Sequence, residues 1–560
     1  MKITINGITC TCLENETILQ VARKNEIHIP TLCYLKNLVN DGNCRMCLVE
    51  DESTGKLICA CNTLCKDGLS VLTHSEKVIK SRVNTLKLLV SNHHKNCIEC
   101  AKSGACSLQS LCKEYGVDYL NNNNRWVTDN SSPYIVRNPN KCILCGRCVA
   151  VCKKTQAVNA LTKIGRGGNT VVGCQFGLPL EKSPCVGCGQ CVLVCPTGAL
   201  VENSEIEAVK TALKDENTLV FAQVAPSVRV SLAEYFNNPV GTFDEGRMVS
   251  ALKQLGFDRV FDINVGADLT AVEESEELLE RIKNHKNLPL FSSCCPAWFK
   301  YVHTFYPNHT AHLSNCKSPT EMLGAVIKNY FSSTENTSKN NIKVVGIMPC
   351  TAKKGEKLRG DDVDFVLTTR ELAKMIDDAG LDYNNLEPNK FDDPFSKYSG
   401  AGLIFGATGG VTEAILRSVC RKLNPNETLV DFVDVRNSRG RKDIVVKCGK
   451  TNLSICVVNG LRNAKDVMDD IVSNKKHYDY VEVMACPGGC VNGGGQNYVD
   501  YSKIDIEDVK LKRAAALYKK DKEINNKISV ESENLKNIYK NIFGSSLNKS
   551  KELLHRKNKK

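Results

Sequence analysis

Two adjacent cysteines, Cys294 and Cys295, end the apolar run "LPLFSSCC". In extended backbone their side chains point to opposite sides. One thiolate could therefore hold a metal while its neighbour does something else. A buried free thiol, which packs like a small hydrophobe, and a disulfide between the two neighbours are the simpler interpretations. The rest of the sequence has to decide between them.

Two further strand-like runs also end in cysteine. "KVVGIMPC" ends at Cys350 and "YDYVEVMAC" ends at Cys486, which is followed by Cys490 on the glycine-rich stretch "PGGCVNGGGQN". Ligand sites of open α/β sheets lie at the carboxyl ends of strands, so these three cysteines and Cys295 are expected to converge. Glycines there would let the backbone approach a bulky cofactor. The pattern predicts a cubane iron–sulfur site within the core.

The cysteine run of bacterial ferredoxins occurs twice upstream, as "CILCGRCVAVC" and "CVGCGQCVLVCP". In two-cluster ferredoxins the fourth cysteine of each run ligates the other cluster. The predicted ligand sets are Cys142, Cys145, Cys148 with Cys195, and Cys185, Cys188, Cys191 with Cys152.

Residues 1–78 combine short β patterns with four cysteines spaced C-x10-C-x2-C-x13-C. The four are Cys33, Cys44, Cys47 and Cys61. Zinc sites usually show two close pairs, whereas only one pair is close here. The segment resembles the 2Fe–2S ferredoxin domain at the start of complex-I-type and hydrogenase subunits. We interpret Cys59 and Cys65 as non-ligands.

A histidine and three cysteines follow in "HHKNCIECAKSGAC". They are His93, Cys97, Cys100 and Cys106. Taken alone, this set suits zinc and an iron–sulfur cluster about equally. Its position directly after a 2Fe–2S domain resembles the histidine-ligated 4Fe–4S segment of the same families.

The chain has 560 residues and 30 cysteines, so several domains are expected. Tight C-x-x-C groups favour metal or iron–sulfur ligation over disulfides. The N-terminus lacks the apolar core of a secretory signal, and no run approaches the roughly 18 apolar residues of a membrane span. We predict a cytoplasmic protein that binds neither membrane nor nucleic acid; an organelle of an anaerobic eukaryote stays open.

Positive charge concentrates in the C-terminal segment, where residues 511–560 hold 14 Lys/Arg against 5 Asp/Glu within a chain of net charge +12. We interpret the segment as a basic helical surface in contact with solvent. The alternative is a docking patch for an acidic partner.

These sites imply a multidomain chain of α+β and α/β parts. The predicted units are 1–78 with the 2Fe–2S site, 79–125 with the histidine-ligated 4Fe–4S site, 126–209 with two 4Fe–4S sites, 210–510 as the α/β catalytic domain and 511–560 as the basic segment. The first four sites form a string of redox centres, so whatever they feed should lie downstream.

The segments "SSCCPAW", "MPCTAKKGE" and "EVMACPGGCVNGGGQN", in this order, resemble the three signatures of the FeFe (iron-only) hydrogenases. The resemblance is to the monomeric, clostridial-like type with four accessory clusters. It implies a β-grasp 2Fe–2S domain, a two-lobed catalytic domain and reversible reduction of protons to H2 at an H-cluster. In that cofactor a cubane shares a cysteine, here Cys490, with a di-iron subcluster that carries CO, cyanide and a bridging dithiolate.

The resemblance also implies roles for single residues. The residues matching the family's cofactor pocket are Ala225, Pro226, Ser227, Met348, Lys353, Phe405 and Met484. The residues matching its proton route are Cys294, Glu274, Ser314, Glu277 and Arg281. Glu274, Glu277 and Arg281 are spaced i,i+3 and i,i+4, so they share one helix face. The departures from the family pattern are Thr320, Gly355, Pro487 and Asn497.

Two alternatives remain from the sequence: a sensory relative with weak turnover, and a non-catalytic iron–sulfur protein of the same superfamily. Cys294 argues against the first, and the full ferredoxin array argues against the second. The expected electron partner is a ferredoxin or flavodoxin, with an NADH-linked complex as the alternative. Maturation proteins for the H-cluster are also expected, and the chain is expected to be a monomer.

Overall fold

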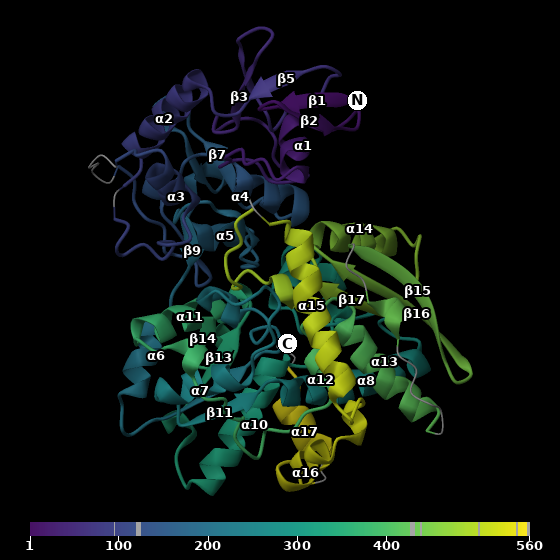
Figure 1. Ribbon diagram of the computed structural model, residues 1–560. Helices are drawn as coiled ribbons and strands as arrows, with labels where there is room; N and C mark the ends of the chain where they lie inside the picture. The colour runs from purple at the N-terminus through teal and green to yellow at the C-terminus, as the bar shows by residue number, and fades with distance from the viewer. Residues whose placement is uncertain are drawn as a thin grey trace.

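The computed structural model describes residues 1–94, 96–118, 125–425, 432–436, 440–501, 504–544 and 547–556. Its N-terminal part sits on one end of a larger α/β body, and the C-terminal segment lies across that body (Figure 1). Among the described helices, none is long and apolar enough to cross a membrane.

The N-terminal unit is a mixed sheet packed on one short helix. Its strands are ordered β2-β1-β5-β3-β4, with β1 antiparallel to β2 and parallel to β5. The Thr17 side chain and Gln20 form a capping box at the start of the helix, which satisfies backbone donors there. The elements are β1 (Lys2–Ile5), β2 (Ile8–Thr11), α1 (Ile18–Lys24), β3 (Leu48–Asp51), β4 (Leu57–Cys59) and β5 (Ser70–Leu72).

The next two units connect this sheet to the catalytic body. The segment with the predicted histidine-ligated site lies between two helices in the sequence. In the two-cluster ferredoxin unit, β6 pairs antiparallel with β9. Gly146 and Gly189 have φ of +82° and +69° where α4 and α5 begin, a conformation that favours glycine. The elements are α2 (Glu76–Ser91), α3 (Ser107–Glu114), β6 (Ile135–Arg137), α4 (Arg147–Ala150), β7 (Thr162–Ile164), β8 (Val171–Gly173), α5 (Gln190–Val194) and β9 (Leu200–Glu202).

The first catalytic lobe is a parallel sheet in the order β11-β10-β13-β14. Its central strands are almost wholly buried, as expected for a parallel sheet covered on both faces. The elements are α6 (Ile206–Leu213), β10 (Leu219–Val224), α7 (Gly246–Gln254), β11 (Arg259–Asp262), α8 (Asn264–Asn284), α10 (Pro319–Thr334), β13 (Ile342–Met348), β14 (Phe365–Thr368) and α11 (Thr369–Asp378).

The second lobe has the strand order β12-β17-β16-β15, in which only β15 runs antiparallel to its neighbour. The elements are β12 (Leu290–Phe291), α9 (Pro296–Phe305), α12 (Gly400–Ile404), α13 (Gly410–Leu423), β15 (Arg441–Cys448), β16 (Thr451–Asn459), α14 (Leu461–Val472) and β17 (Tyr480–Met484). The predicted fold class, with its ferredoxin units and two-lobed α/β catalytic part, is confirmed.

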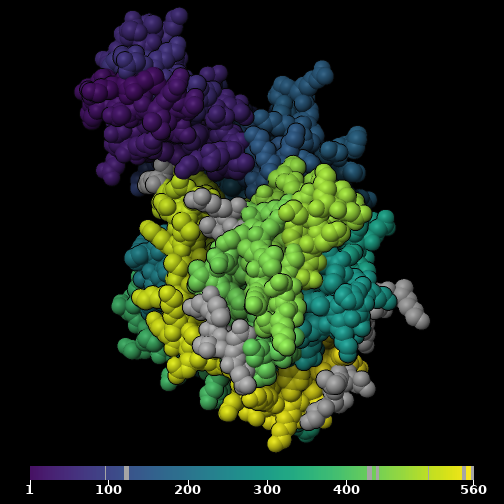
Figure 2. All heavy atoms as spheres, turned by 90° about the vertical axis from the view of Figure 1, so that its right-hand side faces the viewer, coloured from purple at the N-terminus to yellow at the C-terminus, as the bar shows by residue number. Residues whose placement is uncertain are grey.

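The C-terminal segment runs along the outside of both lobes (Figure 2). It contains α15 (Ile506–Glu523), α16 (Glu533–Asn541) and α17 (Leu547–Leu554). Leu517 and Arg513 on α15 are buried, whereas Lys519 and Lys522 are exposed. The helix is therefore packed on one side and basic on the other. Part of the predicted segment 511–560, including residues 557–560, lies outside the described residues.

Three predicted boundaries, those after residues 78, 209 and 510, fall within the helices α2, α6 and α15. The division after residue 209 cuts α6, which packs against β10 and β14 of the first lobe. Because a packed helix moves with its sheet, we propose that the catalytic unit begins near residue 204.

Candidate active site

A cavity lies between the two lobes, next to the carboxyl ends of β10, β12, β13 and β17. Its empty volume is about 760 Å³. The predicted site residues that line it are Ala225, Pro226, Ser227, Cys294, Cys295, Met348, Cys350, Lys353, Phe405, Met484, Cys486 and Cys490. The structure therefore brings together all the ligand and pocket residues that the sequence assigned to the catalytic part.

The four thiols assigned to the cubane face this cavity, and the protein surrounds them on their other sides. They are Cys295, Cys350, Cys486 and Cys490. Burial raises the pKa of every one of them, because a low-dielectric surrounding disfavours the thiolate. The charge of Cys295 adds to this effect at Cys350, whose pKa rises to about 12. Four thiolates need a compensating positive charge here, and an iron cluster has it.

The backbone of the glycine-rich loop after β17 lies so close to neighbouring backbone that side chains would not fit on it. Without side chains there, the cavity beside the loop keeps room for a large group. A Cβ on Gly489, where φ is +93°, would lie 2.6 Å from the Thr408 nitrogen. A Cβ on Gly493 would lie 2.1 Å from the Pro349 carbonyl oxygen. Both distances are below van der Waals contact, so glycine is required at these positions. The donor set and the closely packed loop fit an iron–sulfur cofactor.

The remaining wall of the cavity is largely apolar, and Lys353 is the only charged side chain among the described residues that line it. Met348, Phe405 and Met484 are buried, and thioether side chains adapt to irregular surfaces. The Lys353 ammonium donates to Glu356 at 2.9 Å. Burial alone would lower the pKa of Lys353, but Glu356 raises it above its ordinary value. The lysine is therefore a fixed positive charge at the edge of an apolar cavity.

Behind Cys294 the predicted proton-route residues form a continuous group. Glu274 is fully buried on α8, and its charge is the largest single contribution after burial to the raised pKa of Cys294. Neither carboxyl oxygen of Glu274 has a hydrogen-bond partner of normal geometry among the described residues. The Ser314 hydroxyl nevertheless lies near enough to lower the pKa of Glu274. Glu274 therefore lies between Cys294 and Ser314 and interacts with both.

The pKa of Glu274 is raised to about 8. Burial is the main cause and the negative charge of Glu277 is the second, while Ser314, Arg281 and Arg556 oppose them. A carboxyl group whose pKa lies near neutral pH can both accept and release a proton during turnover. This is the property that a relay needs.

The outer end of the group is anchored and close to solvent. The Ser314 hydroxyl donates to Glu277 at 2.7 Å, and the Arg281 guanidinium contacts the same carboxylate at 2.6 Å. Arg281 also donates to the Leu313 carbonyl at 3.0 Å. Ser314 lines a surface cavity of about 2190 Å³. The five residues therefore extend from the buried cavity to one at the protein surface.

The four departures from the family pattern have local contacts. Thr320 lines the main cavity, and its hydroxyl lies 3.8 Å from the Met348 sulfur. A Cβ on Gly355 would lie 2.6 Å from the Tyr134 ring, so glycine there lets the ferredoxin unit approach. The Asn497 amide donates to the Ser231 carbonyl. The Pro487 carbonyl accepts from Asn492 at 3.1 Å.

The ferredoxin thiols are grouped as the crossed pairing predicts. A second cavity, of about 420 Å³, is lined by Cys142, Cys145, Cys148 and Cys195. Cys152 is close enough to raise the pKa of Cys185, Cys188 and Cys191 by its charge. The fourth cysteine of each run therefore lies with the other run.

The second of these sets lies against the catalytic cavity. A Cβ on Gly494 would lie 2.3 Å from the Cys188 carbonyl oxygen, and the Thr351 hydroxyl donates to the Gly187 carbonyl at 2.6 Å. The charges of Cys188 and Cys350 both act on Cys486. Electrons leaving this ferredoxin set would enter the catalytic cavity directly.

In the first N-terminal set the predicted ligands are in contact in pairs. Cys33 contacts Cys44, and Cys47 contacts Cys61. Cys59, interpreted as a non-ligand, contacts Cys47 as well and accepts from Arg45 at 3.0 Å.

The histidine of the next set is buried. Burial lowers the pKa of His93 to about 4, which keeps the imidazole neutral and able to ligate iron. A Cβ on Gly198 would lie 2.5 Å from the Cys100 sulfur, so this set borders the two-cluster ferredoxin unit.

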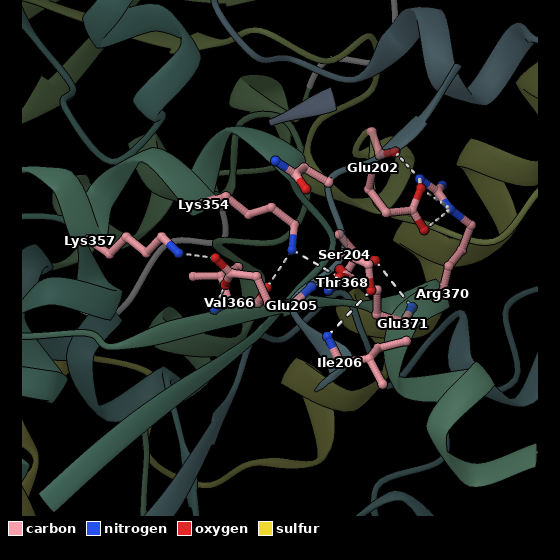
Figure 3. A network of polar contacts seen from close by, with 12 residues as sticks. Glu202, Ser204, Glu205, Ile206, Lys354, Lys357, Val366, Thr368, Arg370 and Glu371 are labelled. Carbon is pink, nitrogen blue, oxygen red and sulfur yellow. Dashed lines mark hydrogen bonds and ion pairs between the residues drawn. The ribbon is translucent and has the colours of Figure 1, made fainter. Parts of the chain in front are cut away.

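A buried polar network joins the ferredoxin unit to the first catalytic lobe (Figure 3). Arg370 pairs with Glu202 at 2.8 Å and donates to the Gly494 carbonyl at the same distance. Lys354 pairs with Glu371 at 3.0 Å, whose carboxylate also accepts from the Glu205 nitrogen at 2.9 Å. Arg370 therefore connects β9 to the loop that follows Cys490.

The sequence did not identify several residues near the sites. Glu356 pairs with Lys353, and Cys316 lies 3.9 Å from Glu277. Arg556 is one of the charges acting on Glu274. Cys420 and Cys448 form a disulfide that spacing alone could not pair. Only the "KKGE" spacing of Lys353 and Glu356, an i,i+3 pair, offered a local signal.

Five known families match consecutive parts of the chain. They are the 2Fe–2S iron–sulfur cluster binding domain (residues 1–76), the NADH-ubiquinone oxidoreductase-G iron–sulfur binding region (82–120), the 4Fe–4S dicluster domain (141–199), the iron only hydrogenase large subunit, C-terminal domain (218–494) and the iron hydrogenase small subunit (507–558).

Two relatives match over almost their full length. Iron hydrogenase 1 of Clostridium pasteurianum is 40% identical over 100% of both chains. The NADP-reducing hydrogenase subunit HndD of Solidesulfovibrio fructosivorans is 40% identical over 99% of this chain and 98% of its own. Among solved structures, the [FeFe]-hydrogenase HydA1 from Chlamydomonas reinhardtii is 33% identical, with a TM-score of 0.55 over 63% of this chain and 98% of that one.

Proposed function

The chain belongs to the FeFe (iron-only) hydrogenases, and from that premise we propose which of its residues perform the reaction. It catalyses the reversible reduction of protons to H2 at an H-cluster, with electrons relayed through accessory iron–sulfur clusters. One observation supports the residue assignment most strongly. Three strand-end thiols, the Cys490 thiol of the following loop, a fifth thiol and a buried lysine line one largely apolar cavity.

Cys295, Cys350, Cys486 and Cys490 would hold the cubane, with Cys490 as the shared ligand to the di-iron subcluster. When bound, the H-cluster supplies the iron at which two protons and two electrons combine to H2. Lys353 would donate a charge-assisted hydrogen bond to an anionic ligand of that group. The buried side chains of Met348, Met484 and Phe405 exclude water from it.

The proton route is built from the residues behind Cys294. A proton from water enters near Ser314 and Glu277 and is held on the carboxyl group of Glu274. Glu274 passes it to the Cys294 sulfur, which lines the cavity. Arg281 positions Glu277 through their 2.6 Å contact. In H2 oxidation the same groups move the proton outward.

The thiol sets upstream form the electron route. The family matches bear out 2Fe–2S and 4Fe–4S domains. For the count we propose one 2Fe–2S cluster, three accessory 4Fe–4S clusters and the H-cluster. The set with Cys188 is the last step, because its carbonyl touches the loop of the catalytic cavity. The sets with Cys33 and His93 are the entry points.

We retain a soluble ferredoxin or flavodoxin as the proposed electron carrier. Cys97 and Cys100 are partly exposed, so a carrier could approach that set closely. The NADP-reducing relative supports the alternative of a nicotinamide-linked assembly. Maturation proteins are proposed because CO, cyanide and the dithiolate are not groups of the chain. Cytoplasmic location and a monomeric state remain predictions.

The ligand assignment is tested on protein matured with its H-cluster, by iron content and the infrared bands of CO and cyanide. Cys295→Ser should lose these bands, because a cubane ligand is gone. Cys456→Ser, a change at a fully buried thiol of β16, should keep them. Full band intensity in the Cys295→Ser protein would contradict the assignment.

A further inference from the structure

The last described residues of the chain are fastened to the segment that follows Ser314. Cys316 and His555 form an antiparallel bridge. The Lys317 nitrogen donates to the Leu554 carbonyl at 2.8 Å, and the Arg556 nitrogen donates to the Asn315 carbonyl at 2.8 Å. The C-terminal clip, defined here as residues 554–556, is therefore hydrogen-bonded to the backbone of residues 315–317, which directly follow Ser314 of the proton route.

Side chains of the C-terminal segment also hold α8. His555 Nε2 lies 2.8 Å from the Glu273 carboxylate, and the Tyr539 hydroxyl donates to the same group. Glu273 directly precedes Glu274. The clip thus contacts both the helix that carries Glu274 and the segment that carries Ser314.

The Arg556 guanidinium points inward from the clip. It stacks over the Phe299 ring at 4.2 Å, and its side chain is only 17% exposed. Nη2 donates to the Ser293 carbonyl at 3.4 Å, next to Cys294, and lies 3.6 Å from Glu321. Nε and Nη1 are buried without a hydrogen-bond partner among the described residues. The ion pair with Glu321 therefore involves one nitrogen of the guanidinium, and the other two carry buried positive charge beside the proton route.

We propose that the C-terminal clip positions the proton relay, and that Arg556, which donates to the Ser293 carbonyl next to Cys294, is its positioning residue. This inference rests on the proposed relay through Glu274 and Cys294. Arg556 touches neither substrate nor cofactor; it acts through Glu274.

Electrostatics around Glu274 agree with this role. The charge of Arg556 lowers the pKa of Glu274 and partly opposes burial and Glu277, which raise it. The other titratable or charged groups that interact electrostatically with Glu274 or with Arg556 are Arg281, Cys294, Cys316, Glu321, Glu356, Arg359 and Tyr480. Glu321 is also contacted by Arg359 at 3.3 Å, so it does not depend on Arg556 alone.

The sign of the effect follows from charge. Removing the guanidinium should raise the pKa of Glu274 further, so the carboxyl group releases its proton less readily. H2 evolution and H2 oxidation both need that release at every turnover, because in either direction the proton must leave Glu274 before the next one arrives. Both rates should therefore fall at a given pH, and the midpoint of the pH profile of turnover should move upward.

The test compares Arg556→Gln, Arg556→Lys and a control, Arg421→Gln, in the matured full chain. Arg421 pairs with Glu531 of the C-terminal segment at 3.0 Å and is not among the charges that act on Glu274. The first readout is infrared titration of the protonated carboxyl band of Glu274, identified by its absence in Glu274→Gln. The second is the pH profile of H2 turnover with a small dye as redox partner.

Arg556→Gln should shift the titration midpoint upward by about one pH unit, a tenfold change in proton affinity. The midpoint of the pH profile of turnover should move upward with it. Arg556→Lys should restore most of both, and Arg421→Gln should change neither. An unshifted midpoint in Arg556→Gln would overturn the inference even if the relay is correct. Failure of the relay itself would appear separately, as normal turnover in Glu274→Gln.

Discussion

At the scale of single residues, neighbouring groups of the same chemical type behave differently because their surroundings differ. Cys295 faces the other strand-end thiols, whereas Cys294 faces Glu274. On α8, Glu274 is fully buried while Glu276 is 55% exposed and pairs with Lys422. Burial and not residue type therefore makes Glu274 a group that exchanges protons near neutral pH.

Glu274→Gln should lower H2 turnover by about 10²–10⁴-fold, the usual contribution of a positioned acid–base group. In the unaltered chain Glu274 should be protonated at pH 7 and ionise through about pH 8, whereas an ordinary carboxyl group is ionised at both. Dye-driven H2 assays and infrared titration check the two statements. Glu276→Gln on the same helix is the control, and equal turnover in both variants would contradict the assignment.

At the scale of elements, strand ends and one buried ion pair set the geometry. β10, β12, β13 and β17 end at the cavity, which makes distant cysteines neighbours. The Arg370–Glu202 pair joins α11 to β9 with both side chains nearly buried. Breaking such a pair leaves an unpaired buried charge, which costs several kcal/mol.

Arg370→Gln should therefore cost about 3–5 kcal/mol of local stability and loosen the contact between the ferredoxin unit and the catalytic loop. Hydrogen exchange of the amides in β9 and residues 493–497 should become faster. Lys374→Gln breaks an exposed pair with Asp378 on the same helix and should cost under about 1 kcal/mol. Unchanged exchange in Arg370→Gln would contradict the proposed connection.

Features that depend on the spacing of residues along the chain could be predicted from the sequence. Cysteine spacing and strand-like runs placed the ligand sets, and helical spacing placed Glu274, Glu277 and Arg281 on one face. It did not predict the Glu202–Arg370 pair or the position of Arg556, because partners about 170 and 280 residues apart leave no local pattern. The mixed burial of α15, basic on one side and packed on the other, likewise depends on tertiary contacts.

At the scale of the whole molecule, an N-terminal electron-transfer part is joined to a catalytic part. The N-terminal units, to which the upstream thiol sets belong, sit on one end of the α/β body (Figure 1), and the set with Cys188 adjoins the cavity. The C-terminal segment, which matches the iron hydrogenase small subunit, wraps the outside and ends beside the proton route. Electrons and protons therefore reach the cavity from different parts of the chain.

A chain shortened to residues 204–560 should keep H2 evolution with a small reductant, because the cavity and relay lie within it. With reduced ferredoxin it should lose most turnover, since the accessory clusters are gone. Steady-state rates with both reductants test this. Equal ferredoxin-driven rates in the short and full chains would show that the upstream clusters are not the route.

The most direct test of the account is the fate of the two adjacent cysteines. In the Cys294→Ala protein we expect intact CO and cyanide infrared bands and normal iron content, because Cys295 still ligates the cubane. H2 production should nevertheless fall almost to zero, and Cys294→Asp should retain more activity because a carboxyl group can also transfer protons. Loss of the cluster in Cys294→Ala, or near-normal H2 production by it, would contradict the relay.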